Sequence, residues 1–165
     1  MIQGHPQICL FQPEIPQNTG NIGRLAAATQ CRLHIIQPTG FSLNDKNARR
    51  AGLDYWPFLD LEIHENLDAL LGNFKPQNVA FFSARATKFY WEMSHQVELL
   101  VFGRETKGLP PDYFARYPES FFTIPIYHHG VRSLNLANAV SVATYHQLLK
   151  RRQAFAAATP VQTYD

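Results

Sequence analysis

Short, mainly apolar runs recur along the chain, and they constrain its fold more than any other feature of the sequence. Each run is bounded by Gly, Pro or polar residues, and stretches with helical spacing lie between several of them. The runs cover residues 8–11, 32–37, 78–83, 98–103 and 121–126. Apolar runs of this length between turn signals are typical of buried strands. Strands that alternate with helices predict an α/β domain with a mainly parallel sheet flanked by helices.

Helical spacing is clearest in two segments. Asn18 is placed to cap the first helix, whose apolar positions include Ile22 and Ala26. The last helix is expected over residues 134–153, with Val140 and Ala143 on its apolar stripe. Two further helices are predicted, a short basic one at 45–53 and an acidic, amphipathic one at 62–74. A strand at 58–61 is expected to precede the acidic helix.

The chain has 165 residues, which suits one domain with its own core. We expect this domain to span residues 1–153, followed by a loose tail at 154–165. A hydrophobic fraction of 45% and a charged fraction of 17% exclude a disordered chain or a coiled coil. The apolar runs are too short to cross a bilayer. Residues 1–6 show no basic region followed by an apolar one, so we expect a cytoplasmic protein without a signal peptide.

Several common kinds of site have no support in the sequence. Cys9 and Cys31 are too few for a disulfide framework or a four-ligand zinc site, and we expect both thiols to be buried. His128 and His129 are adjacent, which favours a loop pair over a shared metal ion, so we predict no metal. The chain contains neither G-x-S-x-G nor a Cys with a His at a recognisable spacing, so acyl transfer is not indicated.

The positive charge is rich in arginine. The net charge is only +2, but the chain has 10 Arg and 5 Lys, and arginine is well suited to binding phosphate and stacking on bases. The basic clusters are either solvated helix faces or phosphate contacts. Candidates for phosphate contacts are Lys46, Arg49, Arg50, Arg85 and the cluster at 150–152. Tyr90 and Trp91 either stack on bases or pack within the protein.

Three segments at strand–helix junctions carry unusual polar residues and glycines, and ligands of open α/β sheets bind at such junctions. Residues 16–24 contain Gly20, Gly23 and Arg24 at the start of a helix. The glycines allow either close backbone approach or helix packing. They do not form a dinucleotide-binding fingerprint, because G-x-G-x-x-G is absent from the chain.

The other two segments follow later strands. Residues 102–110 combine two glycines with Glu105 and two cations, which fits either a ligand-binding loop or a polar turn. Residues 124–139 place Ser133, Asn135 and Asn138 around the start of an apolar helix. Capping explains one of these polar residues but not Asn138 inside the helix.

These segments, in this order, resemble the motifs of the SPOUT methyltransferases, in particular the SpoU branch of RNA ribose methyltransferases and its small TrmL (YibK-like) group. The resemblance covers residues 8–150. It is carried by PEIPQNTGNIGR at 13–24, LHIIQPTGF at 33–41, RRAGLDYW at 49–56, FGRETKGLP at 102–110 and RSLNLANAVSV at 132–142. Two positions depart from the usual pattern, because Arg104 replaces a more frequent proline and Gly23 a bulkier apolar residue.

The resemblance implies methyl transfer from S-adenosylmethionine to the ribose 2'-hydroxyl of the wobble nucleotide of tRNA. This nucleotide is cytidine or uridine at position 34, with leucine isoacceptors as the expected substrates and the anticodon stem-loop as the bound partner. A C-terminal trefoil knot and a homodimer are also implied, and neither a metal nor a membrane is. Methylation of another tRNA or rRNA position remains an alternative, as does a non-catalytic RNA-binding module of the same fold.

Site residues follow from the resemblance position by position. The implied catalytic set is Asn18, Arg24, Glu105, Ser133 and Asn135. The implied cofactor-binding set is Phe82, Gly103, Ile124, Ser133, Leu134 and Asn138. A free guanidinium is too weak an acid to exchange a proton readily at neutral pH. Arg24 is therefore expected to take part in proton removal only if Asn18 and Glu105 hold its guanidinium near an RNA phosphate.

Overall fold

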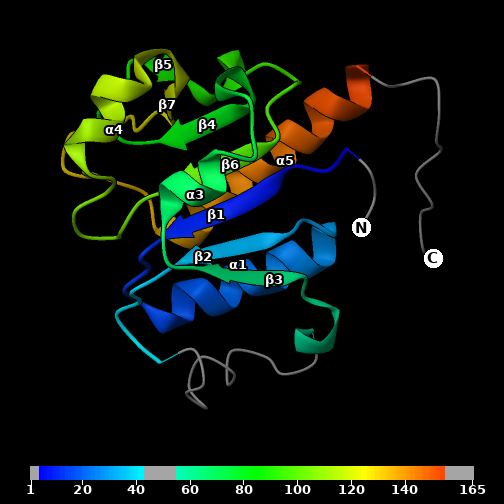
Figure 1. Cartoon of the computed structure of the whole chain (residues 1–165). Helices are drawn as coiled ribbons and strands as arrows, with labels where there is room; N and C mark the ends of the chain where they lie inside the picture. Colours follow the sequence, from blue (N-terminus) through cyan, green and yellow to red (C-terminus); the bar gives the residue numbers. More distant parts are fainter. Residues whose placement is uncertain (1–3, 43–54, 155–165) are drawn as a thin grey trace.

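The computed structural model describes residues 4–42 and 55–154. Its centre is a seven-stranded sheet in the order β3-β2-β1-β6-β4-β7-β5 (Figure 1). All pairings between these strands are parallel, as predicted. The strands are β1 (Gln7–Phe11), β2 (Leu33–Ile36), β3 (Leu61–His64), β4 (Val79–Phe82), β5 (Lys88–Phe89), β6 (Leu99–Phe102) and β7 (Phe121–Thr123).

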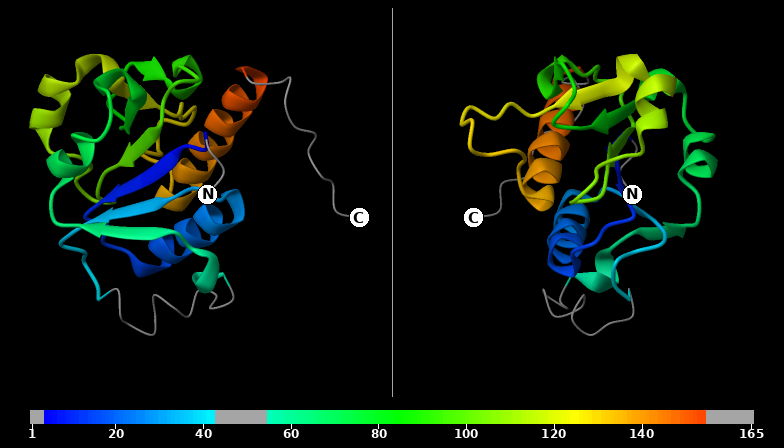
Figure 2. Two further views of the ribbon diagram at one scale, coloured as in Figure 1. Left: turned by 45° about the vertical axis from the view of Figure 1, so that its right-hand side comes forward. Right: turned by 90° about the vertical axis from the view of Figure 1, so that its left-hand side faces the viewer.

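Helices cover both faces of the sheet. The α-helices are α1 (Pro16–Thr29), α3 (Leu67–Leu71), α4 (Pro111–Arg116) and α5 (Leu136–Ala154). Helices α1 and α5 lie on one face, and α3 and α4 lie on the other (Figure 2). Residues 8–11 of strand β1 are all apolar because both faces are covered. Ile8 and Leu10 pack toward α1 and α5, while Cys9 and Phe11 pack toward α3 and α4.

Four short 3₁₀ turns complete the described elements. They are η1 (Trp56–Phe58), η2 (Pro76–Asn78), η3 (Tyr90–Glu92) and η4 (Pro118–Ser120).

Cys9 and Cys31 are buried free thiols, as predicted. Among the residues described, no helix is both long and apolar enough to cross a membrane.

The strand expected at 58–61 and the acidic helix expected at 62–74 are misplaced. Strand β3 covers Leu61–His64, and helix α3 is confined to Leu67–Leu71. Parallel pairing with β2 recruits this segment, in the register Leu33 with Leu61. The α3 helix starts later because Asn66 caps it, accepting hydrogen bonds from the next turn. The basic helix predicted at 45–53 lies outside the described residues.

The ends of the two long helices also differ from prediction. Helix α1 starts at Pro16, two residues before Asn18, so Asn18 is not its cap. Proline fits the first turn because its missing N–H has no partner there. Helix α5 starts at Leu136 rather than at 134. Helix α4 and strand β5 were not predicted, since both are too short for a clear periodic pattern.

The parallel sheet gathers its loops at one edge. Strands β1 and β6 are neighbours, and the segments that follow them lead into α1 and α4. The segment after β7 leads into α5, which packs against α1. The three junctions singled out in the sequence therefore meet at the carboxyl edge of the sheet. The trefoil knot stays a prediction. Of the tail expected at 154–165, residue 154 ends helix α5, and residues 155–165 lie outside the described residues.

Candidate active site

Glu105 ties the segment after β6 to the start of α1. Its carboxylate oxygens accept hydrogen bonds from the backbone N–H of Glu14 at 2.8 Å and of Ile15 at 3.2 Å. A third bond comes from the Asn18 side chain, whose Nδ2 lies 3.1 Å from Oε1 of Glu105. A carboxylate is favoured here because a helix N-terminus carries a partial positive charge. Glu105 thus provides the anion at the start of α1.

Asn18 extends this contact to the third segment. It is buried, and its Oδ1 accepts a hydrogen bond from Nδ2 of Asn135 at 2.9 Å. The Oδ1 of Asn135 accepts from the backbone N–H of Ala137 at 2.9 Å and of Asn138 at 3.4 Å, which caps α5. One hydrogen-bonded chain, Glu105–Asn18–Asn135, therefore joins three segments that are far apart in the sequence. We call it the loop network.

Hydrogen bonds between Glu14 and Thr106 form a second connection between the same two segments. The Glu14 carboxylate accepts hydrogen bonds from the backbone N–H of Thr106 at 3.0 Å and from its hydroxyl at 2.8 and 2.9 Å. These bonds hold the pKa of Glu14 below its ordinary value. The sequence analysis missed both residues, although they lie within the quoted motifs, because no local pattern indicates a contact 92 positions away.

The segment after β6 folds tightly on itself. Arg104 and Gly108 exchange two backbone hydrogen bonds, of 2.9 and 3.2 Å. A Cβ on Gly103 would lie 2.3 Å from the carbonyl carbon of Gly108, and Gly108 has a φ of +66°. The close approach at Gly103 leaves no room for a side chain, and the positive φ at Gly108 favours glycine. The Arg104 guanidinium carbon lies 5.6 Å from the centroid of the Phe11 ring, so this departure from the usual motif adds a cation–π contact.

Arg24 lies on another side of α1. Its guanidinium carbon is 5.0 Å from the centroid of the Tyr55 ring, and the residue is exposed. The Tyr55 hydroxyl donates a 2.6 Å hydrogen bond to the Gly20 carbonyl. A Cβ on Gly23 would stand only 3.3 Å from the Tyr55 ring. The glycine that departs from the usual motif therefore makes room for the aromatic ring beneath Arg24.

The implied catalytic residues fall into two groups. Asn18, Glu105 and Asn135 form the loop network, and exposed Ser133 precedes Asn135 by two positions. Arg24 is six residues beyond Asn18, which places it about 120° away around the helix. The hydrogen bonds of Asn18 and Glu105 described above go to each other, to Asn135 and to the backbone. The holding of Arg24 by Asn18 and Glu105 stays a prediction.

The implied cofactor residues line up along the carboxyl edge. Phe82 ends β4, Gly103 follows β6 and Ile124 follows β7, and these three strands are adjacent in the sheet. Phe82 is buried, with its ring stacked 4.6 Å from that of Phe102 between the centroids. The remaining members are exposed on the segment before α5 and on its first turn. They are Ser133, Leu134 and Asn138.

Comparisons with known proteins identify the family of this chain. The family model described as "SpoU rRNA Methylase family" matches residues 5–145. A "tRNA (cytidine(34)-2'-O)-methyltransferase" of Saccharophagus degradans is 46% identical, over 84% of this chain and 90% of that protein. One of the same name from Escherichia coli is 45% identical, over 84% and 88%. The chain belongs to the SpoU methylase family.

Solved structures place this SpoU-family chain in the same fold. A structure described as "Structural insights into the 2-OH methylation of C/U34 on tRNA" has a TM-score of 0.79 and 42% identity, covering 93% of this chain and 99% of that one. The SpoU methyltransferase AviRb from Streptomyces viridochromogenes, solved with AdoMet, has a TM-score of 0.77. It is 18% identical, over 92% of this chain and 59% of its own, and so supports the fold alone.

The basic cluster at 150–152 of this SpoU-family chain lies away from the loop network. The Lys150 amine donates to the backbone carbonyls of Trp91 and Met93, and the Arg151 guanidinium donates to that of Val97 at 2.8 Å. Val97 precedes β6, so these contacts lie toward the amino edge of the sheet. Lys150 and Arg151 therefore secure α5 against the chain entering β6, and only Arg152 of the cluster is exposed.

The other candidates for RNA contact differ in their exposure and packing. Arg85 is exposed, whereas Lys46, Arg49 and Arg50 lie outside the described residues. Tyr90 packs within the protein, with its ring 4.8 Å from that of His146 on α5 between the centroids. Trp91 is 42% exposed and stacks on Phe89, with 4.6 Å between the ring centroids.

Proposed function

We propose that this chain transfers a methyl group from S-adenosylmethionine to the ribose 2'-hydroxyl of nucleotide 34, cytidine or uridine, in tRNA. The observation that carries the proposal is the loop network, which joins the three SpoU motif segments at the carboxyl edge of the sheet. The names of relatives 45–46% identical supply the substrate. Leucine isoacceptors, presented by their anticodon stem-loops, are the tRNAs we assign.

The residues along the carboxyl edge fit the chemistry of such a cofactor. Ile124 is half-buried and Leu134 is partly exposed, so both offer apolar surface to an adenine ring. Ser133 and the backbone of the glycine-containing loop at 103–108 offer hydrogen-bonding groups to the polar parts. When bound, a sulfonium cofactor supplies an electrophilic methyl group and a good leaving group. Phe82 closes the base of this edge beneath the pocket we propose.

The loop network acts in positioning. Both oxygens of Glu105 accept hydrogen bonds, and both polar ends of the Asn18 and Asn135 amides are paired. Side chains satisfied in this way hold the starts of α1 and α5 at a fixed separation. In-line attack by a ribose hydroxyl requires such fixed geometry, and orientation lowers the barrier to reaction substantially.

Arg24 is the residue we assign to the hydroxyl proton and the neighbouring phosphate. Its exposed guanidinium, stacked on Tyr55, is accessible to an RNA backbone. Arginine binds phosphate through a rigid fork of donors. A phosphate held there would bring the adjoining ribose close to the guanidinium, whose positive charge favours loss of the hydroxyl proton to water as the methyl group is transferred.

A homodimer is supported by an apolar stripe on α5. Val142, Tyr145 and Leu149 are 38%, 58% and 50% exposed. Their spacing of three and four residues places them on one face of the helix. We assign this stripe to a second copy of the chain.

We also place the protein in the cytoplasm, as a single domain over residues 1–153 with a tail at 154–165.

The test is methyl transfer from labelled S-adenosylmethionine to total tRNA that lacks wobble ribose methylation, followed by mapping of the label. We expect one 2'-O-methyl group at position 34 and saturable binding of the cofactor. Label at another position of tRNA, or in rRNA only, would contradict the assigned substrate. Cofactor binding without transfer to any RNA would contradict the enzymatic assignment, and absence of cofactor binding would favour an RNA-binding module.

A further inference from the structure

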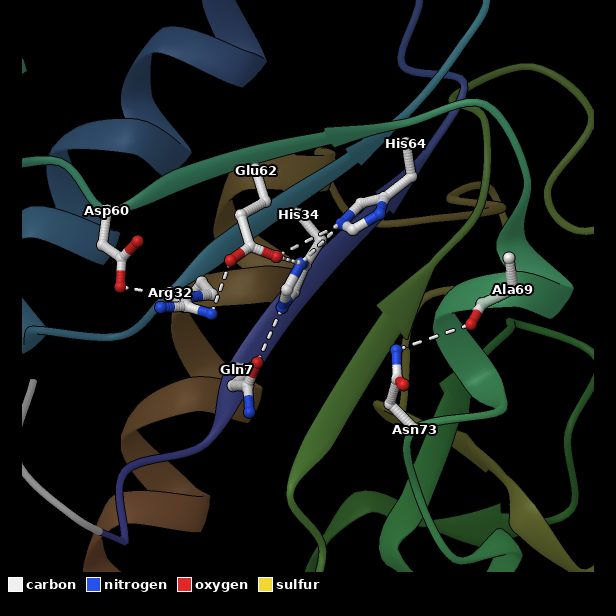
Figure 3. Close-up of polar contacts among 8 residues, drawn as sticks. All are labelled: Gln7, Arg32, His34, Asp60, Glu62, His64, Ala69 and Asn73. Carbon is white, nitrogen blue, oxygen red and sulfur yellow. Dashed lines mark hydrogen bonds and ion pairs between the residues drawn. The ribbon is translucent and has the colours of Figure 1, made fainter.

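Three potential metal ligands converge on the sheet face that carries α3 and α4, away from the loop network. His34 on β2 pairs in register with Glu62 on β3, and His64 lies two residues further along β3 (Figure 3). The Nδ1 of His34 is 2.9 Å from Nε2 of His64. The Oε2 of Glu62 lies 3.6 Å from the first nitrogen and 3.7 Å from the second. These atoms form a small triangle.

The size of the triangle suits a transition metal. Tetrahedral zinc has bonds of roughly 2.0–2.2 Å to imidazole nitrogen and carboxylate oxygen, which sets neighbouring donor atoms about 3.3–3.5 Å apart. Distances of 2.9, 3.6 and 3.7 Å need changes of only a few tenths of an ångström. Two imidazoles and one carboxylate also form a donor set that favours divalent transition metals over Mg²⁺ or Ca²⁺.

Neighbouring residues orient each donor atom. The Oε1 of Gln7 lies 2.7 Å from Nε2 of His34, which places the proton on Nε2 and directs the lone pair of Nδ1 toward His64. Arg32 holds Oε1 of Glu62 at 2.5 Å, so Oε2 faces the histidines. Asp60 in turn fixes Arg32 through a 2.9 Å bond to its Nε (Figure 3). Such outer contacts are characteristic of metal sites.

The three proposed ligands differ in their exposure to solvent. The His34 side chain is only 3% exposed, while those of Glu62 and His64 are 41% and 23% exposed. Desolvation lowers the pKa of His34 to about 4, with further lowering by His64 and Arg32. The exposed side gives an ion a path of entry and room for a water ligand.

We propose that His34, Glu62 and His64 bind one divalent transition metal, with Zn²⁺ as the best-matched ion. A histidine–histidine hydrogen bond would explain the 2.9 Å contact alone, but not a carboxylate oxygen almost equidistant from both rings. The bound ion joins the edge strand β3 to β2, and water completes its coordination. The role we assign to the ion is structural, and this proposal does not depend on the proposed methyl transfer.

The experiment is a titration of untagged, chelator-treated full-length protein with Zn²⁺, followed by calorimetry. We expect one ion per chain and an increase in melting temperature. Glu62→Gln and His64→Ala should each weaken binding at least about tenfold, since even loss of an outer-shell partner costs 10–100-fold. The matched control is the double variant His128→Ala/His129→Ala. It removes two exposed histidines from a loop and should bind Zn²⁺ like the wild type.

Several results would overturn the proposal. Wild-type protein that binds no Zn²⁺, or loses binding equally in the control, contradicts it, as does unchanged binding in Glu62→Gln and His64→Ala. If the variants unfold without metal, Co²⁺ bound to the wild type decides the question. Intense visible absorption that Zn²⁺ abolishes and Mg²⁺ does not supports a tetrahedral site with nitrogen ligands, whereas the weak spectrum of hexahydrated Co²⁺ overturns it.

Discussion

Two polar clusters in this molecule, the loop network and the His34–Glu62–His64 triangle, differ in how their atoms are satisfied. In the network, each amide of Asn18 and Asn135 both donates and accepts, and Glu105 accepts three hydrogen bonds. In the triangle, three potential ligand atoms face one another across 2.9–3.7 Å. A saturated network positions loops, whereas converging ligand atoms can bind a cation. The predictions below test this distinction, from the largest expected effect to the smallest.

Arg24→Lys tests the residue that stands outside the network. Lysine keeps the positive charge but loses the planar fork and the stack on Tyr55. We expect single-turnover methyl transfer to fall at least about 100-fold, which is the scale of a lost proton-transfer group. Arg116→Lys on α4 is the control and should transfer methyl like the wild type. Full activity in Arg24→Lys would show that Arg24 does not handle the proton.

Glu105→Gln tests the centre of the loop network. Glutamine keeps the shape, but its amide donor would face N–H groups that now meet a carboxylate. We expect methyl transfer to fall about 10- to 100-fold, since small displacements of reacting groups have costs of that order. Glu65→Gln, an exposed carboxylate near α3, is the matched control. Equal rates for the two variants would remove the positioning role of Glu105.

Tyr145→Glu tests the apolar stripe on α5. A charge at this 58% exposed position is tolerated in a monomer but disfavoured in an apolar interface. We expect light scattering to give a dimer mass for the wild type and a monomer mass for the variant. The control is Glu92→Gln on η3, which should remain a dimer. A wild-type monomer at micromolar concentration would contradict the assignment of this stripe.

Asn135→Ala separates capping from positioning. Asn135 caps α5, and Asn66 caps α3 through the same kind of bond. Asn66→Ala should lose about 1 kcal/mol of unfolding free energy, measured in urea. Asn135→Ala should lose more, because it also removes the hydrogen bond to Oδ1 of buried Asn18. Only Asn135→Ala should also slow methyl transfer, because Asn135, unlike Asn66, binds Asn18. If Asn66→Ala slows transfer equally, stability rather than loop position governs the rate.

The sheet was predictable because its central strands are buried on both faces. Runs such as 99–102 are apolar throughout, so their burial did not depend on which face was inward. The edge strand β3 was not predictable in this way. Its residues Leu61–His64 include charged Glu62 and half-buried neighbours, and pairing with β2 decided its conformation. Tertiary pairing overrode the helical pattern expected over 62–74.

The site was predictable only in part, for a similar reason. Motif segments brought Asn18, Glu105 and Asn135 to attention, but their mutual hydrogen bonds span 87 and 117 positions. Asn18 therefore looked like a helix cap, a role that the sequence permits locally. The sequence does not indicate the triangle, because His34 lies within an apolar run and its partners are about 30 residues away. Long-range register has no local signal.

The central claim is methylation of the 2'-hydroxyl of nucleotide 34, and one substrate pair tests it most directly. Two otherwise identical leucine tRNAs are compared, one with ribose and one with 2'-deoxyribose at position 34. Labelled S-adenosylmethionine provides the methyl group. We predict one methyl group per molecule of the ribose substrate and none in the deoxyribose substrate. Equal labelling of both would mean that the acceptor atom lies elsewhere in the RNA and would contradict the proposed function.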